Sequence, residues 1–209
     1  MNGKATVFVV DDDSDARDQL AALLAKREID VECFASGEAF LGACRWLPRS
    51  CAIFDIGLPG MDGLQLQAEL SKRGLPLPVV FLTGHGDIPT SVRAIKAGAF
   101  DFLVKPALPS VLLASIQAAL DESERLSRRV GESQGANALL AGLTEREREV
   151  LQWAVEGLAN KLIARKLGIS HRTVEIHKAR IMHKTGAASV LDLAHLVEAC
   201  PAFPAAPEV

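Results

Sequence analysis

Polar residues with complementary chemistry stand at the ends of four strand-like runs in the first half of the chain. One run leads into the acidic stretch Asp11–Asp13, a later one into Asp55, and two more into Thr83 and Lys105. Carboxylates that gather in one place need a cation, and an oxygen-only ligand set open to solvent suits Mg²⁺. Beside such a cation, Asp55 is expected to act as a nucleophile towards a phosphoryl group and to form an acyl phosphate. The metal ion and Lys105 would neutralise the charge, and Thr83 would donate a hydrogen bond to the phosphoryl oxygen.

Each of these residues also has an ordinary explanation when it is taken alone. An acid after a strand often caps the next helix, so Asp13 or Ser14 is expected to cap the helix that follows. A single lysine such as Lys105 is most often a surface residue, and a threonine such as Thr83 is usually a turn hydroxyl. The combination at four successive strand ends is what favours a functional site.

The elements that would hold these residues alternate along residues 1–120. Short apolar runs rich in β-branched residues predict strands, and amphipathic stretches of helical length lie between them. The predicted strands are Ala5–Val10, Val31–Phe34, Ala52–Phe54, Val79–Leu82 and Phe100–Val104. The predicted helices are Asp15–Arg27, Gly37–Trp46, Gly63–Lys72, Ile88–Ala97 and Pro109–Leu120. Five such repeats favour an α/β fold, in which helices cover both faces of a five-stranded parallel sheet.

The order of the strands decides whether the polar residues meet. In a sheet ordered 2-1-3-4-5, the first, third, fourth and fifth strands are consecutive neighbours. Ligands of such sheets bind beyond the carboxyl ends of the strands. We therefore expect Asp12, Asp55, Thr83 and Lys105 to converge at one edge of the sheet.

The second half of the chain predicts a connection and an all-α domain. Residues 121–129 are charged and favour a helical extension, whereas 131–141 are rich in Gly, Ser, Gln and Ala and favour a flexible linker. We therefore predict an α/β unit at 1–120, a helical or flexible linker at 121–142, a four-helix domain at 143–200 and a frayed Pro-rich tail at 201–209. Thr144 with Glu147 forms a capping box that starts the first of the four helices.

A helix-turn-helix is predicted inside this second domain. The short helix Asn160–Leu167 is followed by the turn residue Gly168 and by a helix that Ser170 caps and that runs to about Lys184. Such an arrangement places a helix in the major groove of DNA. Residues 158–185 carry seven basic side chains and one acid, which favours contact with phosphates, although a solvated helix face would have the same composition.

The helical period divides the residues of the capped third helix into two faces. Val174 and Ile181 are expected to pack inward. The residues expected to meet base edges are Arg172, Glu175, Ile176 and Ala179. Glu175 would accept a hydrogen bond from a cytosine amino group, unless it is only a solvent-exposed acid. The remaining predicted DNA contacts, mainly to phosphates, are Asn160, Lys161, Thr173, Lys178, Arg180 and Lys184.

Residues 1–120 resemble the receiver domain of two-component response regulators. The matching segments are Val9–Asp13, Asp55–Gly63, Thr83–Asp87, Ala97–Phe102 and Lys105-Pro106. The resemblance implies a flavodoxin-like (βα)5 fold in which Asp55 is the phospho-acceptor and Asp11 and Asp12 hold Mg²⁺, with the backbone carbonyl of Gly57 as a further ligand. It also implies that Thr83 and Phe102 form a switch pair, that a cis bond precedes Pro106, and that His85 belongs to a mobile loop.

Residues 143–200 resemble the LuxR-type helix-turn-helix domain of the same regulators. The matching segments are Leu143–Leu151, Gly157, Asn160–Ala164, Leu167–Ser170, Thr173–Glu175, His177 and Ile181–Lys184. The two resemblances together are typical of the NarL/FixJ type and imply a phosphorylation-dependent transcriptional regulator rather than an enzyme. The implied partners are a sensor histidine kinase, double-stranded DNA, RNA polymerase and, on phosphorylation, a second copy of the chain.

Other classes of protein remain open at this point. A Mg²⁺-dependent phosphatase can share an Asp nucleophile, but its nucleophile typically follows the first strand. An autoinducer-binding transcription factor can share the second domain, and a regulator that binds DNA without phosphorylation can keep the receiver fold. The four cysteines lack the spacing of a zinc site and are expected to be free, buried thiols. Because no apolar run reaches membrane-spanning length, we expect a cytoplasmic protein with no membrane partner.

Overall fold

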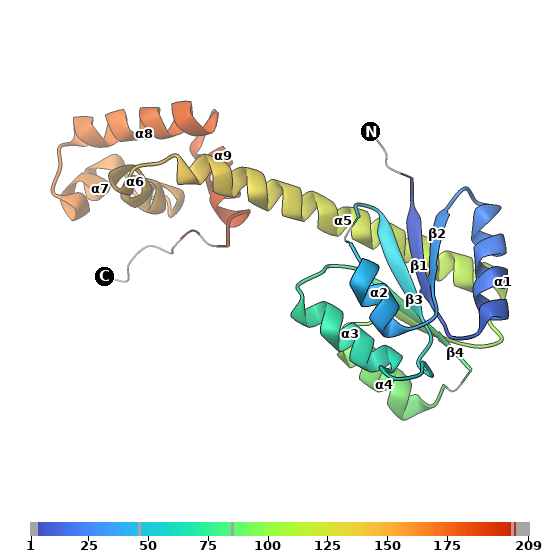
Figure 1. Cartoon of the computed structure of the whole chain (residues 1–209). Coiled ribbons are helices and arrows are strands. Elements are labelled where there is room, and N and C mark those ends of the chain that lie inside the picture. The colour runs from blue at the N-terminus through green and yellow to red at the C-terminus, as the bar shows by residue number, and fades with distance from the viewer. Residues whose placement is uncertain (1–3, 46, 85, 202, 204–209) are drawn as a thin grey trace. The chain divides into compact units, whose positions relative to one another are not determined.

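The computed structural model describes residues 4–45, 47–84, 86–201 and 203. The chain divides between Ser127 and Arg128 into two compact units. The first contains a sheet flanked by helices and the second contains helices, and each is described by itself below (Figure 1). The predicted domain limits themselves remain an expectation.

The first unit is built on one parallel sheet. Its strands are β1 (Thr6–Val10), β2 (Asp30–Phe34), β3 (Ser50–Phe54), β4 (Val79–Thr83) and β5 (Asp101–Val104). They lie in the order β2-β1-β3-β4-β5, as the sequence predicts. The inner strands β1, β3 and β4 are buried along their whole length. The edge strands β2 and β5 are only partly buried.

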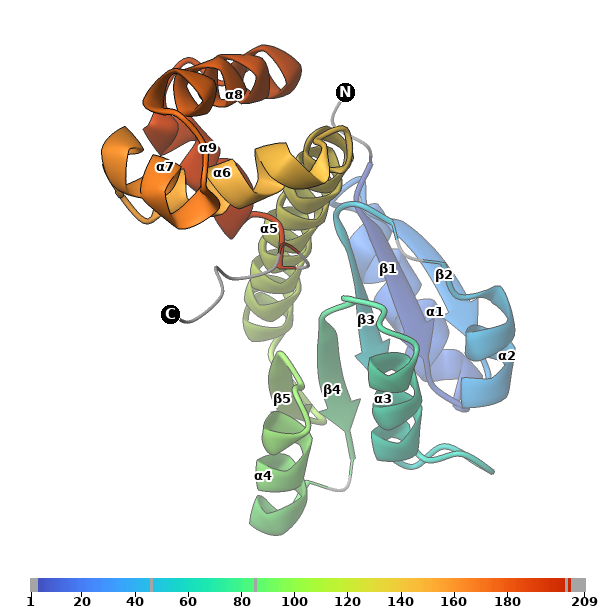
Figure 2. The same ribbon diagram turned by 90° about the vertical axis from the view of Figure 1, so that its left-hand side faces the viewer.

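Five helices accompany the sheet: α1 (Ser14–Ala25), α2 (Gly37–Ala43), α3 (Gly63–Lys72), α4 (Ile88–Lys96) and α5 (Pro109–Ala141). Side chains alternate along β1, so Val7 and Val9 pack with α1 and α5 while Phe8 and Val10 pack with α2 and α3. Two apolar layers therefore hold the sheet between them, and Figure 2 shows helices on both of its faces. This packing fixes where each strand ends.

Two helices end more than two residues away from their predicted limits. The helix that begins at Gly37 ends at Ala43, and Trp46 lies outside the described residues. The helix α5 begins in the first unit, continues past the boundary at Ser127, runs for 33 residues and includes the segment 131–141 that was expected to be flexible. Ala136 and Leu140 of this segment are buried in the core of the second unit. Apolar packing of one helix face thus outweighs the low helix propensity of Gly131 and Gly135.

The second unit contains α6 (Glu145–Val155), α7 (Asn160–Leu167), α8 (His171–Thr185) and α9 (Val190–Glu198). The predicted capping box of Thr144 and Glu147 is present, and Ser170 caps α8. Gly168, between α7 and α8, has φ of 63°, a conformation that favours glycine. The turn therefore joins α7 and α8 as a helix-turn-helix requires.

Two further predictions concern the burial of the cysteines and the absence of a membrane-spanning segment. All four cysteines are free, but only Cys51 and Cys200 are buried; Cys33 is exposed because it lies on the edge strand β2. Among the helices that the structure describes, none is long and apolar enough to cross a membrane.

Candidate functional site

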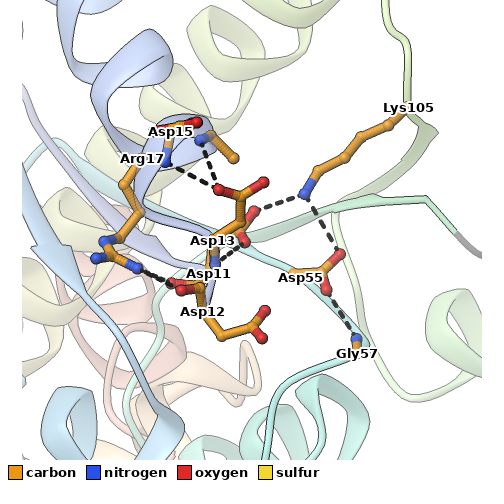
Figure 3. A network of polar contacts seen from close by, with 9 residues as sticks. Asp11, Asp12, Asp13, Asp15, Arg17, Asp55, Gly57 and Lys105 are labelled. Atoms are coloured by element: carbon orange, nitrogen blue, oxygen red, sulfur yellow. Dashed lines mark hydrogen bonds and ion pairs between the residues drawn. The ribbon is translucent and has the colours of Figure 1, made fainter.

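Three carboxylates meet at the carboxyl edge of the sheet. Asp11 and Asp12 directly follow β1, Asp55 directly follows β3, and these strands pair in register so that Val10 lies opposite Phe54. One carboxylate oxygen of each residue lies within 4.8 Å of the other two. Asp11 is buried whereas Asp12 is exposed, so the cluster opens to solvent on one side (Figure 3). The convergence predicted from the strand order is present.

Lys105 joins this cluster from the end of β5. Its Nζ lies 2.6 Å from Asp11 Oδ2 and 3.7 Å from Asp55 Oδ1. Its backbone N–H donates to the carbonyl of Thr83 at 2.8 Å, and the bond between Lys105 and Pro106 is cis. Burial alone would lower the pKa of Lys105, but the hydrogen bond to Asp11 and the charges of Asp11, Asp55 and Asp13 raise it above its ordinary value. The ammonium therefore stays charged beside the carboxylates.

Asp55 is held by one oxygen and leaves the other without a hydrogen bond. Its Oδ2 accepts from the backbone N–H of Gly57 at 2.9 Å. Its Oδ1 is buried and has no hydrogen-bond donor among the residues that the structure describes. Buried polar atoms are rarely left so, and an orphaned carboxylate oxygen within a carboxylate cluster fits a cation. The donor set is therefore suited to Mg²⁺.

Asp13 and Gly63 support the site without contributing a ligand atom to the cluster. Asp13 caps α1, since its carboxylate accepts from the backbone N–H groups of Asp15 and Ala16, which confirms its expected capping role. Gly63 lies against the backbone of Asp55, where an added Cβ would stand 2.3 Å from the Asp55 carbonyl oxygen. Gly63 was not singled out from the sequence. Its position directly after Asp62, which caps α3, could have indicated a close approach of the backbone.

The residues expected to form a switch lie on neighbouring strands. Thr83 ends β4 and is buried, and it is the register partner of Val104 on β5. Phe102 is half-buried, with its ring centroid 6.1 Å from that of Phe81. In the loop after Thr83, a Cβ on Gly86 would lie 2.4 Å from Val104, so glycine lets this loop pack against β5. His85, expected to belong to the same loop, lies outside the described residues.

An apolar surface covers α4, β5 and the start of α5. It is formed by exposed side chains that a solitary domain would be expected to bury: Ile88, Val92, Ile95, Phe100, Val104, Leu108 and Val111. Ile88 is 80% exposed and Leu108 is 69% exposed. A gathering of large apolar side chains on one face is typical of an interaction surface. We call this set the α4-β5-α5 surface.

The third helix of the second unit, α8, has the two faces that its period predicts. Val174 and Ile181 are fully buried in the core of the unit. The opposite face is exposed and carries the predicted base-contacting residues Arg172, Glu175, Ile176 and Ala179. Glu175 also lies 3.5 Å from Nδ1 of His171, one turn earlier on the same face. The structure therefore leaves this face open for a groove.

The residues predicted to contact phosphates differ in their exposure and in their partners. Lys161 and Arg180 are exposed, and Lys178 donates to Asn160 Oδ1 at 3.0 Å, which links α8 to the start of α7. Thr173 is half-buried at the first turn of α8, where its hydroxyl lies 2.7 Å from that of Ser170. Lys184 differs, because its ammonium lies 2.7 Å from the buried carboxylate of Glu147 and 3.3 Å from the carbonyl of Gly142.

Lys184 has a partner inside its own unit, which its predicted role as a phosphate contact did not include. Burial alone would raise the pKa of Glu147, but hydrogen bonds from Lys184 and Thr144 outweigh it and lower that pKa. A lysine that neutralises a buried carboxylate is tied to the core of its own unit. Lys184 therefore helps to support α8, and its contact with a DNA phosphate stays a prediction. His177 is half-buried, with an unpartnered Nδ1 among the described residues, in keeping with a packing residue.

Comparison with protein families divides the chain where its two units lie. Residues 7–117 match the response regulator receiver domain, and residues 141–197 match the bacterial regulatory proteins of the luxR family. The two matches together span most of the chain.

Individual relatives match over nearly the full length. The transcriptional regulatory protein FixJ of Azorhizobium caulinodans is 43% identical over 190 residues, which cover 91% of this chain and 90% of that protein. The transcriptional regulatory protein TdiR of Thauera aromatica is 43% identical over 193 residues, 92% of this chain and 85% of that protein. Among solved structures, the response regulator StyR has a TM-score of 0.79 at 43% identity and covers 94% of this chain and 99% of its own.

Proposed function

This chain belongs to the response regulators that join a receiver domain to a LuxR-type DNA-binding domain, and we propose that phosphorylation of Asp55 controls how it binds DNA. The chain is thus a transcriptional regulator of the two-component type. The observation that carries the proposal is the position of Lys105, whose ammonium lies beside both Asp11 and Asp55 at the carboxyl edge of the sheet. A regulator of this kind is expected to act in the cytoplasm, where it meets DNA.

Asp11, Asp12 and Asp55 would hold Mg²⁺ through side-chain oxygens, together with the backbone carbonyl of Gly57. The support for this assignment is the cluster of three carboxylates and the orphaned Oδ1 of Asp55. When bound, the cation supplies positive charge that offsets the negative charge of the carboxylates and of an incoming phosphoryl group. The protein's own residues perform the remaining steps.

The phosphoryl group would come from a phosphohistidine of a sensor kinase. A carboxylate oxygen of Asp55 attacks the phosphorus, an O–P bond forms as the N–P bond breaks, and the leaving imidazole takes a proton from solvent. Lys105 Nζ lies 3.7 Å from Asp55 Oδ1 and would stabilise the negative charge on the phosphoryl oxygens. The reaction modifies the regulator itself, and slow hydrolysis of the acyl phosphate would return Asp55 to its starting state.

Thr83 and Phe102 would pass the change on to the rest of the domain. The phosphoryl group adds about two negative charges beside the end of β4. The Thr83 hydroxyl would move towards them and donate a hydrogen bond, which frees space for the Phe102 ring on the neighbouring strand. Because Phe102 lies on β5, the movement would alter the α4-β5-α5 surface, where two copies of the chain would then associate.

Dimerisation would bring two copies of α8 to paired half-sites on DNA. In each copy, Arg172, Glu175, Ile176 and Ala179 would meet base edges, and Asn160, Lys161, Thr173, Lys178 and Arg180 would contact the backbone or support these contacts. The basic charge of this unit supports such an approach. RNA polymerase would be the further partner of the DNA-bound dimer.

The test compares the full-length protein with its Asp55→Asn variant, each with and without Mg²⁺ and a phosphoryl mimic such as beryllofluoride. We expect the wild type to become dimeric by sedimentation and to protect specific sites in genome-wide DNA footprinting only with the mimic, and the variant to do neither. Equal protection by the two proteins would indicate a regulator that binds DNA without phosphorylation. Turnover of a small phosphoester by the wild type would favour the phosphatase alternative instead.

A further inference from the structure

The acidic loop after β1 is held in place from behind by one arginine. Nη1 of Arg17, in the first half of α1, donates to the backbone carbonyl of Asp11 at 2.6 Å and to that of Asp12 at 3.0 Å. Both carbonyls lie just beyond the last register pair of β1, Val10 with Phe54, so no strand continues alongside them. A single guanidinium therefore gives the carbonyls of two consecutive residues the hydrogen bonds that a further strand would otherwise supply.

Arg17 approaches this loop from the side away from Asp55. In Figure 3 the guanidinium lies on one side of the Asp12 backbone, whereas the carboxylate of Asp12 extends on the other side, towards Asp55 and Gly57. The arginine thus engages the carbonyls and leaves the carboxylates free. Its positive charge also lies behind a cluster of three carboxylates that would otherwise repel one another.

The rest of the loop depends on α1 as well. Asp13 caps this helix, and its own backbone N–H donates to Asp11 Oδ1 at 3.0 Å. The backbone N–H of Arg17 in turn donates to the carbonyl of Asp13 at 3.1 Å. The loop is short and closed on the helix through Asp13, and Arg17 fixes the backbone carbonyls of Asp11 and Asp12.

We infer that Arg17 is a positioning residue for the metal site, which orients the backbone of Asp11 and Asp12 so that their carboxylates converge with that of Asp55. The inference rests on the magnesium site proposed above. Groups that orient metal ligands from the second layer commonly change metal affinity by ten- to a hundredfold when they are removed. Arg17 does not touch the reacting atoms, so its effect would pass entirely through the aspartates.

The chain offers a matched control in Arg73. Its Nη1 also donates to a backbone carbonyl, that of Leu41, at 2.9 Å, in the same unit but beside α2 and α3. Replacement of either arginine by alanine removes a guanidinium-to-carbonyl hydrogen bond from the first unit. Only Arg17, however, is bonded to residues of the acidic cluster, so a general loss of stability and a loss of positioning can be separated.

The experiment measures the Mg²⁺ dissociation constant of the full-length protein by calorimetry, with thermal unfolding of each variant recorded in parallel. We expect Arg17→Ala to weaken Mg²⁺ binding about tenfold or more. Arg17→Lys, which keeps the charge and some hydrogen-bonding capacity, should lie between Arg17→Ala and wild type. Arg73→Ala should bind Mg²⁺ within about twofold of wild type even if it unfolds at a lower temperature.

A second readout uses phosphorylation by a small phosphodonor at increasing Mg²⁺. Because Arg17 would act through metal affinity, saturating Mg²⁺ should restore most of the rate to Arg17→Ala. Wild-type Mg²⁺ affinity in Arg17→Ala would overturn the inference while leaving the proposed site intact. No Mg²⁺ binding by the wild type would overturn the magnesium site and the role of Arg17 together.

Discussion

Lys105 in the first unit and Lys184 in the second both lie 2.6–2.7 Å from a buried carboxylate, yet their surroundings differ. Lys184 and the backbone N–H of Thr144 both donate to the buried carboxylate of Glu147 at the start of α6. Lys105 instead lies beside two carboxylates, of which Asp55 keeps a buried oxygen without a donor.

The difference separates a charge that supports a fold from one that is ready for a reaction. The carboxylate of Glu147 already accepts hydrogen bonds from Lys184 and Thr144, so this interaction contributes to the stability of the fold. The cluster around Asp55 holds three acids against one nearby ammonium, and it gains most when a cation and a phosphoryl group arrive. Changes to the two lysines should therefore affect different properties of the protein.

The largest expected effect follows from Lys105→Ala. Loss of the ammonium removes the charge that faces Asp55 Oδ1, so the rate of acyl-phosphate formation from a small phosphodonor should fall by about a hundredfold. The rate would be measured at saturating Mg²⁺, with Lys72→Ala as the control, since Lys72 is 75% exposed and pairs only with Glu69. If Lys105→Ala unfolds more readily but phosphorylates at the wild-type rate, the comparison with Lys184 breaks down.

The next effect in size concerns the stability of the second unit. Glu147→Gln removes the charge that Lys184 neutralises at a buried position, and we expect it to lower the free energy of unfolding by about 2 kcal/mol. Urea unfolding of the full-length protein, followed by Trp153 fluorescence in a Trp46→Phe background, would measure it. Glu149→Gln on the same helix is the control, because Glu149 pairs with Arg146 nearer the surface. Equal losses in the two variants would contradict the special role of Glu147.

The same pair predicts a pH dependence with a definite sign. The pKa of Glu147 in the folded protein lies below its ordinary value of 4.5, so its contribution to stability is fully present above that value and disappears as the pH falls through the folded pKa. We therefore expect the stability difference between wild type and Glu147→Gln to shrink as the pH is lowered from 6 to about 3. Urea midpoints at several pH values would show it, and a difference that grows in acid would contradict this sign.

The contrast between the two lysines also shows how much the sequence can predict. Asp11, Asp12, Asp55 and Lys105 were found because each follows a strand, and strand order alone brings such positions together. The contact between Lys184 and Glu147 was not predicted, because the two residues are 37 positions apart and no local period links them. Helix limits were predicted closely where a capping residue marks them, as at Thr144 and Ser170, but the length of α5 depends on burial of Ala136 and Leu140 in another core.

The role of Arg17 and the exposure of Cys33 show the same limit in the first unit. The bonds of Arg17 to two backbone carbonyls depend on how the loop turns after β1, which composition does not specify. Cys33 was expected to be buried because it stands among apolar residues, but β2 is an edge strand and leaves it exposed. Patterns along the chain therefore predict elements and their ends better than they predict side-chain partners.

The smallest expected effect sharpens the comparison within the second unit, where Lys161 and Lys166 lie on the same helix. Lys161 is exposed and is expected to contact a DNA phosphate, whereas Lys166 lies over the ring of Trp153 at 4.3 Å from its centroid. Lys161→Ala should weaken binding to all DNA sequences by a few-fold and reduce the slope of log K against log salt by about one per dimer half-site. Lys166→Ala should leave that slope unchanged, because the ammonium of Lys166 contacts an aromatic ring of its own unit.

Binding titrations of the phosphoryl-mimic form at several salt concentrations would measure both slopes. A reduced slope in Lys166→Ala alone would place the phosphate contact at Lys166 rather than Lys161. It would also show that a lysine with a partner inside its own unit, such as Lys166 or Lys184, can still bind DNA.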